Sequence, residues 1–157
     1  MVDTSSFFDY PEDSAVSGLD DKEAFLARLS DVDLAVLMEY VEVRRLRQGE
    51  VLIEIGDVDP SLFIVTDGSL EVRGRRRRRE ERLVWLPIGS VVGELTFFDG
   101  KPRSAKVVAV EPSEVLRLGQ SAFERLAAAH PSLGRAILMD LGRVLSGRFR
   151  KLGAAGS

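Results

Sequence analysis

The chain has 157 residues, of which 45% are hydrophobic and 30% charged, a balance typical of a soluble globular protein with one core. It contains no cysteine, no secretory signal at its start and no apolar run near the roughly 20 residues that cross a bilayer, so we expect a cytoplasmic protein without disulfides, thiolate metal sites or a membrane span. The formal net charge of −3 is unevenly distributed along the chain. Residues 1–21 contain six acidic residues and no basic ones, whereas Arg75–Arg79 form an unbroken basic run.

The first part of the chain predicts a tail followed by two short helices. Residues 1–18 are polar, acidic and without periodicity, and we expect them to be mostly disordered. Asp20 or Asp21 can cap a first helix, and Ser30 or Asp31 can cap a second. The apolar side of the first helix would carry Phe25, Leu26 and Leu29.

From residue 41 to residue 118 the pattern indicates strands. Apolar residues come in short runs separated by Gly, Pro and Asp at intervals of roughly ten residues, which is typical of an all-β roll, sandwich or barrel. The dipeptide Asp67-Gly68 predicts a tight hairpin, because glycine tolerates the positive φ of such a turn. The expected strands are 41–47, 50–54, 61–66, 69–74, 82–87, 106–110 and 114–118.

After Gly119 the pattern becomes helical. Ser121 can cap a helix that ends at His130, and Ser132 can start a longer helix with apolar residues on one stripe. The predicted fold is therefore α+β, mainly β. One domain of residues 19–152 would contain an antiparallel, jelly-roll-like β-roll at about 41–118, flanked by N-terminal helices and by C-terminal helices at about 121–151.

The basic run Arg75–Arg79 has two interpretations. It can form the exposed tip or strand end of a hairpin, with Glu80 and Glu81 as partners. It can also contact the phosphates of nucleic acid or anionic lipid. The run has no interleaved aromatic residues and the net charge is negative, so direct sequence-specific DNA binding is not expected.

Residues 93–105, between two predicted strands, carry groups suited to an anion. Glu94 begins one expected helical turn, whose first N–H groups point outward, and Gly93 lets the backbone approach a ligand closely. Arg103 brings a permanently charged, planar donor to the same place, and Ser104 adds a hydroxyl. A singly charged phosphodiester with a nearby sugar hydroxyl for Glu94 would satisfy this set.

The pattern G-E-L-x-x-x-x-G-x-P-R-S-A at these positions resembles the phosphate-binding cassette of the cyclic-nucleotide-binding domain family. That family includes the catabolite activator protein, the regulatory subunits of cyclic-AMP-dependent kinase and cyclic-nucleotide-gated channels. Upstream glycines at 49, 56, 68 and 89 also fall in family-like places. The resemblance implies that Gly93, Glu94 and Leu95 line the ribose-phosphate and that Arg103, Ser104 and Ala105 hold the phosphate.

The resemblance says less about the base and the output. Wall contacts to the base are expected from Val84, Trp85 and Val92, and Arg148 lies where the final helix of family members often reaches the base. The sequence shows no winged helix, second nucleotide domain or channel, so the expected output is a protein effector or a homodimer formed through the C-terminal helix.

Three functions remain open from the sequence. The first is a non-enzymatic sensor of a 3′,5′-cyclic nucleotide, with cyclic AMP expected first and cyclic GMP next, that signals by movement of its C-terminal helix. The second is a ligand-independent interaction module, in which Arg103 and Glu94 merely form an internal ion pair. The third, an enzyme such as a phosphodiesterase, lacks a His/Asp metal cluster or a nucleophile–base pair to support it, so no catalytic residue, metal or cofactor is expected.

Overall fold

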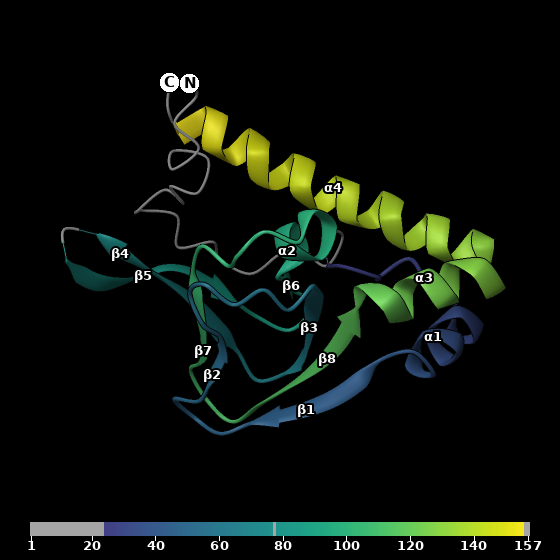
Figure 1. Ribbon diagram of the computed structural model, residues 1–157, viewed down its shortest axis with the longest axis horizontal. Coiled ribbons are helices and arrows are strands. Elements are labelled where there is room, and N and C mark those ends of the chain that lie inside the picture. Colours follow the sequence, from purple (N-terminus) through teal and green to yellow (C-terminus); the bar gives the residue numbers. More distant parts are fainter. Residues whose placement is uncertain (1–23, 77, 156–157) are drawn as a thin grey trace.

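The computed structural model describes residues 24–76 and 78–155, which form two four-stranded antiparallel sheets with helices packed alongside (Figure 1). One sheet has the order β1 (Glu42–Leu46), β8 (Ser113–Gly119), β3 (Ser61–Asp67) and β6 (Val91–Val92). The other has the order β2 (Val51–Ile53), β7 (Lys106–Ala109), β4 (Leu70–Arg76) and β5 (Arg79–Leu86). The predicted fold class, an antiparallel β-roll with flanking helices, is confirmed, whereas the tail predicted at residues 1–18 lies outside the described residues.

Strand β3 joins two halves of the core, because its apolar run is buried on both faces. Side chains alternate along a strand, so Leu62 and Ile64 face the helices while Phe63 and Val65 face the second sheet. The inter-sheet cluster also contains Leu46, Ile53, Leu70, Val72, Leu86, Val92, Val107, Ala109 and Val115. This cluster forms the apolar floor of the candidate site.

The described part of the first predicted helix is not helical, and its proposed caps, Asp20 and Asp21, lie outside the described residues. Residues 25–28 form turns in which Leu26 has a φ of 67°, a left-handed conformation that a right-handed helix cannot contain. The amide of Leu26 donates instead to the Asp140 carboxylate at 2.6 Å. The second predicted helix is present as α1 (Asp31–Met38), and the Ser30 hydroxyl caps it by accepting from the amide of Asp33.

Two helices follow the sheets at slightly different positions from those predicted. Helix α3 (Gln120–Ala129) continues directly from β8 without a side-chain cap, because the first amide of α3, that of Gln120, donates to the Pro60 carbonyl at 3.0 Å. Helix α4 (Pro131–Ala155) starts at Pro131, whose fixed φ and missing N–H suit a first helical position. The two helices cross closely at Gly134, where a Cβ atom would lie 2.7 Å from Cβ of Ala127. Within the described residues, none of the helices is long and apolar enough to cross a membrane.

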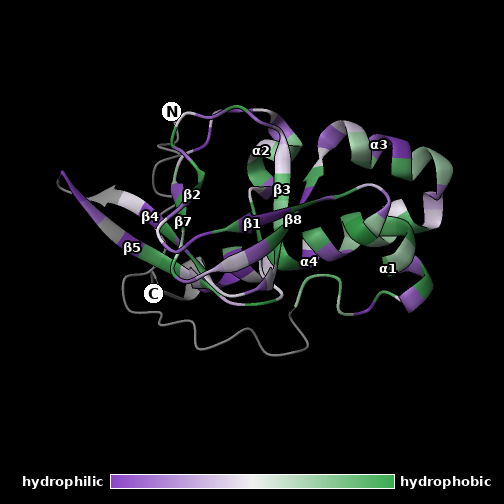
Figure 2. Ribbon diagram, turned by 90° about the horizontal axis from the view of Figure 1, so that it is seen from below, coloured by the Kyte–Doolittle hydropathy of each residue, from purple (hydrophilic) through white to green (hydrophobic). Residues whose placement is uncertain are grey.

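The hairpin of β4 and β5 projects from the body (Figure 1), and its outer end is hydrophilic (Figure 2). Both strands reach further into the basic run than predicted, since Arg76 pairs with Arg79 across the ladder. Arg78 and Arg79 are exposed there. Glu80 forms ion pairs with Arg73 and Lys106, which lie outside the basic run.

Candidate functional site

The predicted cassette forms a helical turn and a returning loop between β6 and β7. Helix α2 (Glu94–Asp99) lies between two glycines in the left-handed conformation, Gly93 with a φ of 85° and Gly100 with a φ of 68°. A Cβ atom at position 93 would lie 2.7 Å from Nη1 of Arg103 and 2.9 Å from the Ser61 carbonyl oxygen. Glycine is therefore required both by the backbone conformation and by the close approach of the Arg103 guanidinium.

A cavity of about 200 Å³ opens between α2, the returning loop and the inter-sheet core. All six residues predicted to bind the ligand line it: Gly93, Glu94, Leu95, Arg103, Ser104 and Ala105. The apolar wall comes from Ile53, Val72, Leu83, Val92 and Val107. The cavity is smaller than typical ligand sites, which have volumes of about 300–1,000 Å³.

Arg103 is only 6% exposed, and its guanidinium is held by main-chain oxygens. Nη1 donates to the Gly93 carbonyl at 2.6 Å, and Nη2 donates to the carbonyls of Asp59, at 2.7 Å, and Ser61. Burial lowers the pKa of Arg103, while the carboxylates of Asp59, Glu94 and Asp57 oppose that shift. A guanidinium keeps its proton in proteins, so the site contains a fixed, largely desolvated positive charge.

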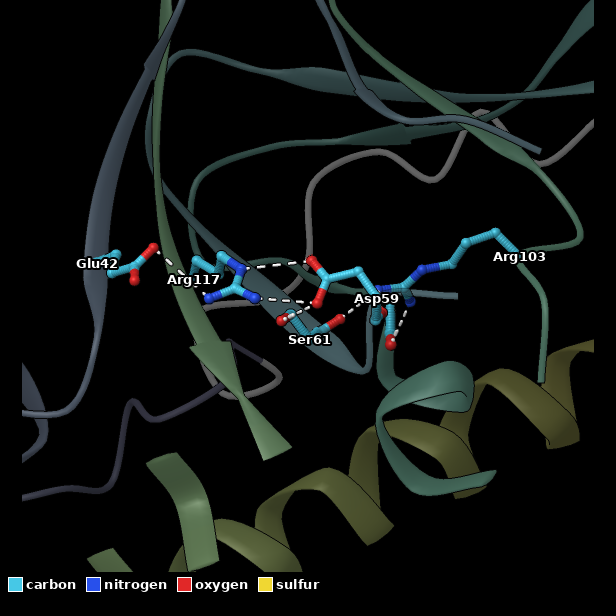
Figure 3. A network of polar contacts seen from close by, with 6 residues as sticks. Glu42, Asp59, Ser61, Arg103 and Arg117 are labelled. Carbon is cyan, nitrogen blue, oxygen red and sulfur yellow. Dashed lines mark hydrogen bonds and ion pairs between the residues drawn. The ribbon is translucent and has the colours of Figure 1, made fainter. Parts of the chain in front are cut away.

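A second polar network lies on the far side of Asp59 (Figure 3). The Asp59 carboxylate accepts from Nη2 of Arg117 at 2.9 Å and from the Ser61 hydroxyl at 2.8 Å, and Arg117 also pairs with Glu42 at 3.5 Å. Burial raises the pKa of Asp59, but hydrogen bonds from Arg117 and Ser61 and the charges of Arg117 and Arg103 outweigh it, so the pKa lies below its ordinary value. Neither Asp59 nor Arg117 was predicted as a site residue, since nothing in their spacing connects them to Arg103.

Glu94 is buried and pairs with the last helix. Nη1 of Arg148 donates to its Oε1 at 2.6 Å, and Nη2 of Arg148 donates to the carbonyl of Val91. Among the described residues no ion pair joins Arg103 to Glu94, so the internal pair weighed from the sequence is wrong. Arg148, for which a base contact was expected, ties α4 to the carboxylate expected to bind a ribose.

Of the three residues predicted to form the wall around a base, one lines the cavity and two do not. Val92 lines the cavity, whereas Val84 packs at the edge of the inter-sheet cluster and Trp85 is 38% exposed and away from the cavity lining. The ladder of β4 and β5 shifts register beside Val84, and at such a bulge two successive residues oppose one partner. Leu83 consequently lines the cavity, a position that a regular alternation along β5 does not predict.

These groups together suit an anion that also carries a hydroxyl group. The buried residues Arg103 and Glu94 line the cavity together with Ser104, and apolar side chains form much of the rest of the wall. Residues 24–76 and 78–155 place no three His, Asp or Glu side chains where they could hold a metal ion. The groups present are those needed for binding by hydrogen bonds and charge.

The model of the cyclic nucleotide-binding domain family matches residues 43–130 of this chain. The chain is 32% identical over 104 residues to the cAMP-dependent protein kinase regulatory subunit of Mycosarcoma maydis, an alignment that covers 63% of this chain and 20% of that protein. It is 31% identical over 116 residues to the cyclic AMP receptor protein of Thermus thermophilus, covering 73% of this chain and 53% of the relative. The chain thus spans about half or less of the length of these relatives.

The same similarity holds in three dimensions. The structure superposes on a cyclic nucleotide-binding domain from Methylobacillus flagellatus with a TM-score of 0.75 and 25% sequence identity, covering 83% of this chain and 79% of the other. The matched family segment begins in β1 and ends after α3, so it includes both sheets and all residues of the cassette.

Proposed function

The chain belongs to the cyclic nucleotide-binding domain family, and on that premise we propose that it is a non-enzymatic sensor of a 3′,5′-cyclic nucleotide. The observation that carries the proposal is the cavity in which Glu94, Arg103 and Ser104 converge opposite an apolar wall. Cyclic AMP is the first candidate, because the two curated relatives are named for it, and cyclic GMP is the second.

The cyclic phosphate is assigned to Arg103 together with Ser104 and Ala105. Three N–H bonds of the guanidinium point to protein carbonyls, so of its five donors two remain for a ligand. Those carbonyls fix the plane of the guanidinium before a ligand arrives. Such preorganisation reduces the conformational entropy lost on binding.

The ribose 2′-hydroxyl is assigned to Glu94, which must then share or exchange its present partner. A buried carboxylate without a hydrogen-bond donor is unfavourable, so Arg148 and the ribose hydroxyl act as alternative partners for Glu94. In our proposal the nucleotide takes over Glu94, Arg148 leaves, and the C-terminal part of α4 moves. The energy for this shift is the difference in ligand affinity between the two positions of α4.

The moving helix also supplies a surface for a partner. Phe149, next to Arg148 in the C-terminal part of α4, is 61% exposed. We propose that a protein effector, or a second copy of the chain, binds this exposed part of α4. Its binding would then depend on the position of the helix. Analytical ultracentrifugation with and without cyclic AMP distinguishes the two, because self-association requires no other protein.

One observation favours a second candidate, the ligand-independent interaction module. Arg103 and Glu94 are each satisfied by protein groups, so the described residues leave neither charge buried and unpaired. In that case the cassette would be a structural part of the fold. The module would keep the same α4 surface and lose only the nucleotide dependence.

Calorimetric titration tests the choice between the two candidates. Purified protein is first analysed by mass spectrometry for released ligand and is then titrated with cyclic AMP, cyclic GMP and a cyclic pyrimidine nucleotide, with 5′-AMP as the control. The sensor is expected to bind one cyclic nucleotide at micromolar concentration, equivalent to about −8 kcal/mol. Absence of heat and of thermal stabilisation at millimolar concentrations of all of them would favour the module.

A further inference from the structure

The turn Asp59-Pro60-Ser61 provides two of the three main-chain acceptors that hold the Arg103 guanidinium. The carbonyls of Asp59 and Ser61 both accept from Nη2, while the Pro60 carbonyl accepts from the amide of Gln120. The amide of Ser61 also donates to the Asp59 carbonyl at 2.9 Å, which keeps the turn narrow. The orientation of Arg103 therefore depends on the conformation of this turn.

The turn is anchored from strand β8. Arg117 directs two donors at the Asp59 carboxylate, Nη2 at 2.9 Å to one oxygen and Nε at 3.4 Å to the other. A two-point contact between a planar guanidinium and a carboxylate fixes both position and angle, which a single contact cannot do. The Arg117 side chain is itself largely buried and bound on its other side by Glu42 of β1.

We propose that Arg117 is a positioning residue for nucleotide binding: by clamping the Asp59 carboxylate, it holds the two carbonyls of the turn that fix the guanidinium of Arg103, a residue of the cavity wall. The inference rests on the proposed function, since it gives Arg103 the cyclic phosphate. Figure 3 shows the order of the groups, with Arg117 on one side of Asp59 and Arg103 on the other. Arg117 is absent from the cavity lining, so its effect must pass through Asp59 and Arg103.

The main test is a double-mutant cycle on cyclic AMP affinity. Arg117→Met keeps an unbranched apolar stem but removes the guanidinium and with it the clamp, and we expect about five- to tenfold weaker binding, as for loss of one ordered hydrogen bond. In an Arg103→Ala background the same change is expected to alter affinity by less than about twofold, because residues that act through one another are not additive. Equal losses in both backgrounds would show general damage to the fold and overturn the proposal, as would unchanged affinity in the single variant.

Two further variants keep the test specific. Arg117→Lys retains the charge but not the fixed fork, so an intermediate loss is expected, and it replaces Arg117→Met in the cycle if that variant does not fold. Arg45→Met is the matched control, because Arg45 pairs with Glu114 across the same two strands at 3.5 Å and does not reach Asp59. The control is expected to bind cyclic AMP as the wild type does, and a loss equal to that of Arg117→Met would count against a specific clamp.

A measurement without ligand separates this inference from the proposed function. The Nε–H signal of Arg103 in ¹⁵N-edited spectra of the ligand-free protein is expected to broaden or shift in Arg117→Met and to stay unchanged in Arg45→Met. If the wild type binds no cyclic nucleotide, the proposed function fails while this signal still decides whether Arg117 orders Arg103. An unchanged Arg103 signal in Arg117→Met would refute the positioning role whatever the ligand.

Discussion

Replacing Arg148 with methionine tests whether the last helix and the nucleotide compete for Glu94. The change removes the 2.6 Å ion pair and the bond to the Val91 carbonyl but keeps the apolar stem that packs beside α2. Removing one partner of a fully buried ion pair costs about 3–5 kcal/mol. The Arg148 side chain is 27% exposed, and water partly replaces it, so we expect about 2 kcal/mol of lost stability in the ligand-free protein.

The complex should lose less, because there the ribose hydroxyl is the partner of Glu94. Cyclic AMP affinity is therefore expected to rise by about tenfold, with roughly thirtyfold as the limit set by 2 kcal/mol. Urea unfolding measures the first quantity and calorimetry the second, with Arg150→Met as an exposed control on the same helix. Preference for cyclic AMP over its 2′-deoxy analogue should also increase. Weaker binding in Arg148→Met would mean that Arg148 supports the bound nucleotide, and the exchange of partners would then be wrong.

Three other changes test the site. Arg103→Ala is expected to weaken cyclic AMP binding by at least about tenfold in calorimetry, since each charge-assisted hydrogen bond contributes about 1.5–3 kcal/mol; a folded variant with wild-type affinity would exclude the phosphate role. Gly93→Ala places a Cβ atom against Arg103 on a residue whose backbone φ is 85°, and it should lower the free energy of unfolding measured in urea by about 1–2 kcal/mol. Gly142→Ala is the control, because it has open space around it and should raise the free energy of unfolding by about 0.5–1 kcal/mol. Because the pKa of Asp59 is lowered, its contribution to stability is present above the ordinary value of 3.8 and is lost as pH falls through the lowered pKa. The unfolding free energy of wild type minus that of Asp59→Asn should be constant at neutral pH and shrink in acid, and a constant difference throughout would contradict this.

The sequence was informative wherever a local rule determines the structure. Positive φ values at Gly93 and Gly100 require glycine, so the ends of α2 could be located from residue type alone. Short apolar runs separated by Gly, Pro and Asp likewise predict most strands of the roll. The six residues expected around the ligand lie within thirteen positions of the chain, and chain connectivity keeps them together at one cavity.

Contacts between segments that are distant in the sequence could not be predicted from such local rules. Arg148 and Glu94 are 54 positions apart, and Asp59 and Arg117 are 58 apart. A charged residue on an amphipathic helix or strand has many candidate partners of opposite sign, and only the packing of α4 and β8 selects one. The bulge that places Leu83 at the cavity could not be predicted for a different reason. A single added residue reverses which side of the sheet its neighbours face, without altering the composition of the strand.

If α4 moves as proposed, its close contact with α3 at Gly134, near one end of the helix, would be the pivot. Its buried residues Leu133, Ile137 and Leu141 lie near that pivot, and Arg148 is fourteen residues beyond the glycine. At 1.5 Å per residue this is an arm of about 21 Å, so a rotation of about 10° at the crossing displaces Arg148 by nearly 4 Å. That distance exceeds the length of the bond to Glu94. In the proposed exchange of partners, a rotation of this size would be enough to separate Arg148 from the Glu94 carboxylate.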